Sequence, residues 1–105
     1  MRSLGPKDDG STVELVVGDE LAVELPETPT SGFRWATLEL PPALRLTDDR
    51  FEAPGSALPG APGTRRLDFQ AISVGGGKLL LQLAARTPRD ISAAPFTAFV
   101  DVVEG

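Results

Sequence analysis

The sequence contains no cysteine and no histidine in its 105 residues. The absence of both residue types excludes disulfides, thiolate nucleophiles, Cys/His zinc sites and His-dependent catalytic triads. Serine and threonine are present, but no histidine or cysteine is available to activate them, and no spacing points to a lysine or carboxylate base. We therefore predict that the protein is not an enzyme, and we expect no cofactor and no metal.

Excess positive charge and long apolar runs are also missing. Ten basic residues stand against fifteen acidic ones, for a net charge of −5, which argues against a nucleic-acid partner. No apolar run is long enough to span a membrane, and no signal peptide opens the chain. The compartment therefore stays open: periplasmic or secreted if a signal peptide was removed, otherwise cytoplasmic.

Glycine and proline are abundant, with eleven and ten copies, and both interrupt regular structure. Between the interruptions, apolar and polar residues alternate with the period of two that is typical of half-buried strands. No segment shows the 3.6-residue apolar stripe of a helix. The alternation predicts strands at about 12–17, 20–25, 33–40, 44–51, 66–71, 78–85 and 96–103.

These strands predict an all-β, immunoglobulin-like sandwich of seven to eight strands, without the usual inter-sheet disulfide. We expect a single domain over 12–105, preceded by a loosely ordered lead-in at 1–11. Residues 53–64, rich in proline and glycine, could be a linker, but too few strands flank them for two domains. A long loop within one domain is favoured.

Several short segments carry local predictions. The apolar phase slips between Trp35 and Leu38, which predicts a bulge or a bend. Gly75-Gly76-Gly77 lacks the helix and lysine of a phosphate loop and is expected to form a sharp turn. Asp48 and Asp49 are too few to form a calcium cage and are expected to be solvated at the end of a short strand.

Three irregular stretches, 26–32, 53–64 and 86–95, join the second strand to the third, the fourth to the fifth and the sixth to the seventh. In a seven-strand sandwich these connections emerge at the same end. The first has two prolines that stiffen the chain and small hydroxyl side chains at Thr30 and Ser31. Thr30, Ser31 and Gly32 alone would also fit an ordinary turn. Phe33 and Trp35, two apart, are predicted to face the core together.

The three stretches resemble the loops of the chagasin-like inhibitors of papain-type cysteine peptidases, peptidase inhibitor family I42. Thr28-Pro29-Thr30-Ser31-Gly32-Phe33, followed by Trp35, is similar to that family's Asn-Pro-Thr-Thr-Gly-Phe/Tyr loop with its nearby Trp. Gly60-Ala61-Pro62-Gly63 occupies the place of its glycine-rich loop, and Arg86-Thr87-Pro88 that of its Arg-Pro-Trp. The resemblance runs roughly from Thr12 to Val103.

The resemblance implies a monomer that blocks the cleft of a papain-like cysteine peptidase with three loops, reversibly and without being cleaved. It places Thr30 and Ser31 near the catalytic cysteine. The third loop lacks the family's Trp, whose contacts Arg89 or Ile91 would have to replace. The peptidase-binding residues that the resemblance implies are Thr28, Pro29, Thr30, Ser31, Gly32, Phe33, Gly60, Ala61, Pro62, Gly63, Arg86, Pro88 and Arg89.

Two other functions remain open on the sequence alone. The chain could be a non-inhibitory immunoglobulin-like binding or adhesion module that retains only the scaffold. It could also be a structural domain of a larger secreted protein. Arg86 has an alternative of its own, a surface ion pair with Asp90 or Glu27 in place of a peptidase contact.

Overall fold

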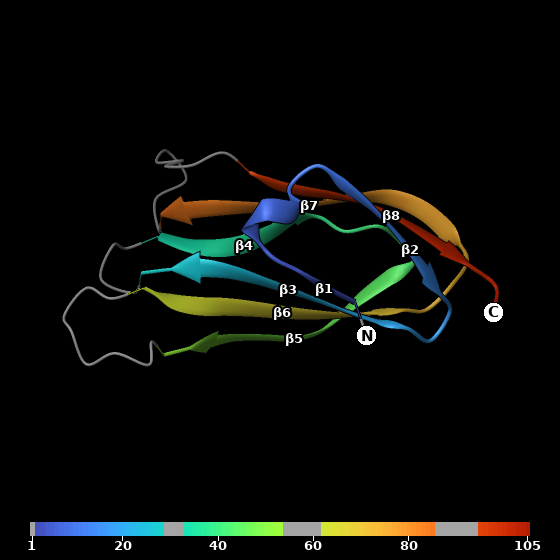
Figure 1. Ribbon diagram of the computed structural model, residues 1–105, viewed down its shortest axis with the longest axis horizontal. Helices are drawn as coiled ribbons and strands as arrows, with labels where there is room; N and C mark the ends of the chain where they lie inside the picture. The colour runs from blue at the N-terminus through green and yellow to red at the C-terminus, as the bar shows by residue number, and fades with distance from the viewer. Residues whose placement is uncertain (1, 29–32, 54–61, 86–94) are drawn as a thin grey trace.

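The computed structural model describes residues 2–28, 33–53, 62–85 and 95–105 (Figure 1). Apart from one short 3-10 helix, η1 (Pro6–Asp8), the regular structure in this part of the chain is β-strand. The strands are β1 (Arg2–Leu4), β2 (Ser11–Val16), β3 (Glu20–Glu27), β4 (Phe33–Glu39), β5 (Leu44–Glu52), β6 (Gly63–Ala71), β7 (Gly75–Ala85) and β8 (Phe96–Val103). No helix in the described ranges has the length and apolar character needed to cross a membrane.

Two four-stranded sheets lie face to face (Figure 1). One has the order β1-β3-β6-β5 and the other β2-β8-β7-β4. The pairings are antiparallel except for β1 with β3 and β2 with β8, which are parallel. This is the immunoglobulin-like strand arrangement, with the first strand divided between the two sheets. The predicted all-β sandwich is confirmed.

The core consists of the apolar residues that alternate along the strands. Phe69 and Leu79 are among its fully buried members, and burial of one such side chain contributes about 1.5–3 kcal/mol. Because no cysteine is present, this packing holds the two sheets together without a disulfide. The other large side chains that are almost fully buried are Leu15, Leu21, Leu25, Leu67, Leu81, Val13, Val23 and Val102.

Residues 2–11 differ from the expected loose lead-in. β1 pairs with β3 in the register Arg2↔Leu21, and Leu4 is buried in the core. Asp9 then accepts a 2.8 Å hydrogen bond from the backbone N–H of Thr97 in β8. One buried leucine and one carboxylate therefore attach this polar segment to both sheets.

The predicted turn at Gly75-Gly76-Gly77 is wrong, because these residues begin β7 and pair with β8. The chain turns just before them, at 72–74. A Cβ atom on Gly77 would lie 2.9 Å from Cβ of Pro41, so glycine here makes room for a proline that follows β4. Gly77 therefore serves close packing within a strand.

Strands β4 and β5 each contain a register shift, of which only the shift in β4 was predicted. The register of β4 against β7 shifts between Thr37 and Glu39, which confirms the predicted bulge. The fourth strand was predicted at about 44–51 and was expected to fade through its charged residues. Instead β5 is continuous from Leu44 to Glu52, with a register shift between Leu46 and Asp48. Its charged residues suit an exposed sheet edge.

Candidate functional site

The strand ends that flank the three irregular stretches lie at one end of the sandwich, at the left of Figure 1. The connections from β3 to β4 and from β5 to β6 start and finish there, and the connection from β7 to β8 starts there and finishes farther along the sheet, where Phe96 is opposite Leu81. The register brings their ends side by side, with Glu27 opposite Gly63 and Phe33 opposite Ala85. We call this part of the molecule the loop end. It agrees with the prediction that the three connections share one end.

Four of the predicted site residues lie within the described ranges. Thr28 and Phe33 are half-buried, Pro62 is exposed and Gly63 is buried. The predictions for the remaining nine lie outside the described residues: Pro29, Thr30, Ser31, Gly32, Gly60, Ala61, Arg86, Pro88 and Arg89. The alternative pairing of Arg86 with Asp90 lies outside them as well.

Trp35 joins the two ends of the first connection. Its side chain is only 7% exposed and packs in the core, as predicted. Phe33, predicted to share that environment, is only half-buried, because it begins β4 at the loop end, beyond the packed centre of the sandwich. The indole Nε1–H of Trp35 donates a 2.9 Å hydrogen bond to the carbonyl oxygen of Pro26. Strand β4 is thus tied to the chain that precedes the connection.

Glu27 is a buried acid that sequence reasoning did not assign to the site. It is 5% exposed, and its Oε1 accepts a 2.8 Å hydrogen bond from the backbone N–H of Trp35. Arg65 of β6 supplies the countercharge, with Nη2 at 2.8 Å from Oε2 and Nε at 3.2 Å from Oε1. Such two-point contact is among the stronger polar interactions in proteins. The pKa of Arg65 is raised above its ordinary value, chiefly by the hydrogen bond to Glu27.

The sequence did carry a signal for this pair. The inward phase of β3 passes through Leu21, Val23 and Leu25 to Glu27, and the inward phase of β6 passes through Leu67 and Phe69 back to Arg65. Glu27 and Arg65 thus stand at inward-facing positions near the same end of two neighbouring strands. Opposite charges so placed are expected to pair, because a buried charge without a partner is costly. The alternative pairing of Arg86 with Glu27 lies outside the described residues, which pair Glu27 with Arg65.

Phe51 and Gly63 complete the packing beneath the second connection. The guanidinium carbon of Arg65 lies 5.7 Å from the centre of the Phe51 ring, within cation–π range. A Cβ atom on Gly63 would lie 2.4 Å from Cζ of Phe51, so the ring occupies the space that a side chain would need. The structure therefore gives Gly63, predicted as a binding residue, a packing role. We call Glu27, Trp35, Phe51 and Arg65 the loop-base cluster.

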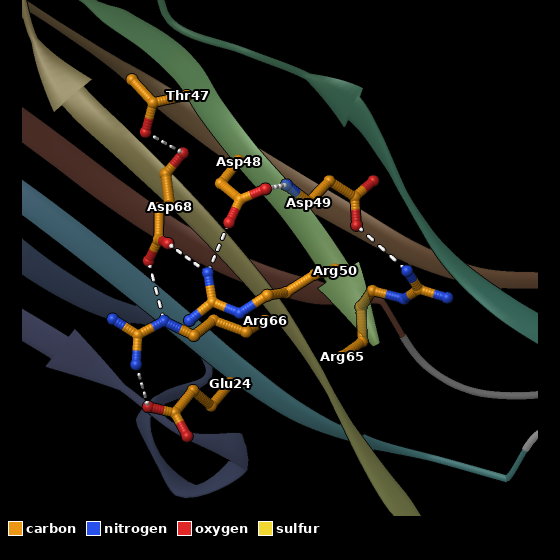
Figure 2. A network of polar contacts seen from close by, with 8 residues as sticks. All are labelled: Glu24, Thr47, Asp48, Asp49, Arg50, Arg65, Arg66 and Asp68. Atoms are coloured by element: carbon orange, nitrogen blue, oxygen red, sulfur yellow. Dashed lines mark hydrogen bonds and ion pairs between the residues drawn. The ribbon is translucent and has the colours of Figure 1, made fainter. Parts of the chain in front are cut away.

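Asp48 and Asp49 are exposed to solvent, as expected, and each also forms an ion pair. Asp48 forms an ion pair with Arg50, and Oδ1 of Asp49 lies 3.3 Å from Nη1 of Arg65 (Figure 2). The hydrogen bond to Asp48 is the main reason that the pKa of Arg50 is raised. Within the described ranges, no three acidic side chains are grouped so that they could hold a metal ion.

The network continues over the outer face of β3, β5 and β6 (Figure 2). Asp68 lies 3.3 Å from Nη1 of Arg50 and 3.0 Å from Nε of Arg66. Arg66 also reaches Glu24 of β3 at 3.5 Å. Such partly exposed pairs contribute little to stability. They cover the face of the sheet, and Asp49, whose backbone N–H bonds to Asp48, connects them to Arg65 of the buried pair.

An apolar pocket of about 300 Å³ opens beside the loop-base cluster. It lies between η1, the ends of β3, the beginning of β4 and the beginning of β8. Its lining residues are Pro6, Asp9, Leu25, Pro26, Trp35, Pro95 and Phe96. Trp35 therefore borders both the base of the first connection and this pocket.

Comparison with known proteins gives a consistent result. The model of the chagasin family peptidase inhibitors, I42, matches residues 14–98. Chagasin of Trypanosoma cruzi is 32% identical over 72 residues, an alignment that spans 64% of this chain and 66% of chagasin, just under two thirds of its length.

Solved structures agree on the fold. The cysteine protease inhibitor EhICP2 of Entamoeba histolytica superposes with a TM-score of 0.87 at 19% identity, over 97% of this chain and 95% of that one. PbICP-C, solved in complex with falcipain-2, superposes with a TM-score of 0.68 at 15% identity over the whole of both chains. The family match covers most of the sandwich, from β2 into β8, and with it this chain belongs to the chagasin family of peptidase inhibitors, I42.

Proposed function

We propose that the protein inhibits papain-like cysteine peptidases reversibly, by placing the loop end in the active-site cleft. The observation that carries this proposal is the convergence of three connections at one end of the sandwich (Figure 1), above a buried base. The family's inhibitory function supports it, as does PbICP-C, a protein of similar fold that was solved in complex with falcipain-2.

The arrangement suits an inhibitor for a physical reason. A standard inhibitor interface buries about 800 Å² per partner, an area for which one connection alone is small. Connections whose ends are fixed lose less conformational entropy on docking, so more of the contact energy appears as affinity. In this proposal the protein acts as a monomer, is not an enzyme and is not cut by its target.

Within the proposal, Thr30 and Ser31 of the first connection lie nearest the catalytic cysteine. Thr28, Pro29, Gly32 and Phe33 complete that connection's contribution. The second connection contributes Gly60, Ala61 and Pro62, and the third contributes Arg86, Pro88 and Arg89. Gly63, also predicted as a contact, is buried and packs against Phe51, so in this proposal it supports the second connection from within the sheet.

The test is a titration of papain and of a cathepsin L-type peptidase with the purified protein. Hydrolysis of a fluorogenic peptide reports the remaining peptidase activity. We expect saturable inhibition at nanomolar to low micromolar concentration, with the inhibitor intact afterwards. No inhibition of either enzyme at high micromolar concentration would favour the alternative, a binding module that keeps only the scaffold. Cleavage of the protein during the assay would contradict the proposed mechanism.

A further inference from the structure

The Glu27–Arg65 ion pair lies between the bases of two different connections. Glu27 ends β3 and therefore precedes the first connection, whereas Arg65 follows the second connection by only a few residues in β6. The two residues are 38 positions apart in sequence. Trp35, which follows the first connection, donates its backbone N–H to the same carboxylate. Phe51, which precedes the second connection, lies under the same guanidinium.

The geometry of this pair differs from that of its neighbour on the same two strands. Glu27 and Arg65 meet through two hydrogen bonds of 2.8 and 3.2 Å, with side chains 4% and 11% exposed. Glu24 and Arg66 also join β3 to β6, but through one contact of 3.5 Å, with side chains 41% and 22% exposed. A two-point contact fixes the plane and direction of the guanidinium. The single, more exposed contact between Glu24 and Arg66 does not fix the plane of the guanidinium in this way and adds little; Arg66 is also paired with Asp68 at 3.0 Å.

We propose that Glu27 and Arg65 are positioning residues of the inhibitory surface: their ion pair holds the first and second connections in the relative placement in which both fit the peptidase cleft. This inference rests on the proposed function. The pair need not touch the peptidase, since it is buried beneath the connections. It acts by removing relative motion of two strand ends before binding, so that docking does not have to restrict that motion.

The first experiment compares inhibition constants against papain for two variants and two matched controls. Glu27→Gln keeps an oxygen that can accept the N–H of Trp35 but loses the charge, and Arg65→Lys keeps the charge but loses the two-point contact. Glu24→Gln and Arg66→Lys make the same changes in the exposed pair. We expect the first two variants to raise Ki about tenfold and the controls to change it by less than about twofold.

The assay is run well below the melting temperature of each variant, and circular dichroism checks that each is folded. The double variant Glu27→Gln/Arg65→Lys completes a double-mutant cycle on Ki. If the pair acts as a unit, the double variant loses no more affinity than the worse single variant. Full additivity, unchanged Ki in both folded single variants, or an equal loss in the controls would each overturn the proposal.

A second readout does not depend on inhibition. Arg65→Lys alters a residue beside the second connection. If the ion pair couples the two connections, this substitution must shift the amide resonances of Thr28 and Phe33, which lie beside the first. Arg66→Lys should leave those resonances in place. If the wild-type protein does not inhibit any peptidase tested, the proposed function fails, and this measurement alone decides whether the ion pair couples the connections. Unshifted amides in Arg65→Lys would show that it does not.

Discussion

The carboxylate of Glu27 accepts a 2.8 Å hydrogen bond from the backbone N–H of Trp35, although the two residues belong to different sheets. Arg65 approaches the same carboxylate from β6. A carboxylate that is 5% exposed is tolerated because both of its oxygens have donors and its charge has a partner. The Glu27 carboxylate is therefore in contact with both sheets and lies beside the ends of two connections.

The first prediction concerns the tip of the first connection. Replacing Thr30 with arginine should abolish inhibition of papain, because the bulky cation would occupy the position proposed to lie nearest the catalytic cysteine. The melting temperature should change little, since a loop substitution away from the core usually costs less than about 0.5 kcal/mol. Ki and thermal unfolding of Thr30→Arg and of the wild type provide the comparison. Equal inhibition by the two proteins would remove this connection from the mechanism.

The second prediction concerns Gly63. In Gly63→Ala the added Cβ atom would lie 2.4 Å from Cζ of Phe51 and 2.5 Å from the carbonyl oxygen of Glu52. Both the ring and the backbone of β5 would have to move, at a cost of about 1–3 kcal/mol. The measurement is urea unfolding followed by circular dichroism.

Gly76→Ala is the matched control for that substitution. Its Cβ atom would lie 3.5 Å from the carbonyl oxygen of Val100, which is an ordinary contact, and the free energy of unfolding should stay within about 0.5 kcal/mol of the wild type. Similar values for Gly63→Ala and Gly76→Ala would show that β5 is not held against Gly63 as described.

The third prediction concerns the indole of Trp35. Phenylalanine cannot replace the Nε1–H that bonds to the carbonyl oxygen of Pro26, and it leaves part of the buried volume empty. Trp35→Phe should therefore lower the free energy of unfolding by about 1–3 kcal/mol. Phe99→Leu, at a side chain that is 46% exposed, should cost less than about 0.5 kcal/mol. Urea midpoints from circular dichroism test both variants, and an unaffected midpoint in Trp35→Phe would contradict the role of this hydrogen bond.

The fourth prediction concerns pH. Because the pKa of Arg65 is raised in the folded state, its stabilising contribution is fully present below the unfolded-state pKa and is lost only as the pH rises through the higher folded value. The wild type should therefore keep this contribution through pH 11. A lysine has an ordinary pKa near 10.4, so Arg65→Lys should lose the charge within reach of experiment.

The quantity to measure is the difference in unfolding free energy between the wild type and Arg65→Lys. We expect it to be constant from about pH 7 to 9 and to grow above about pH 10. The same difference for Arg66→Lys should grow less, because that side chain is in a more exposed ion pair. A difference for Arg65→Lys that stays constant up to pH 11 would show that the charge at this position does not stabilise the fold.

Local patterns predicted much of the framework but misjudged several details. Alternation located the strands and identified Trp35 as core, because facing a sheet interior is a property of each residue's place in its own strand. It failed where the backbone remained extended despite unfavourable composition. Gly75 to Gly77 form part of β7 because β8 supplies hydrogen-bond partners, and the charged second half of β5 stays regular because β6 pairs with it as far as Glu52.

The candidate site divides in the same way. The family's loop pattern identified the first connection, and the order of the strands predicted that all three connections share one end. The loop-base cluster was not predicted, although the sequence places the charges of Glu27 and Arg65 at inward-facing positions of their strands. The packing role of Gly63 was not predicted, since nothing local shows that the Phe51 ring fills the place of its side chain.

The sequence by itself determined the strand pattern, the inward faces and the family, because alternating polarity and short loop motifs are written into neighbouring residues. Only the tertiary structure decided which distant residues meet. The register of β3 against β6 brings Glu27 and Arg65 together across 38 positions, and the facing of the two sheets brings Trp35 to the same carboxylate. Such contacts depend on how strands pair and pack over the whole chain, and no local pattern specifies them.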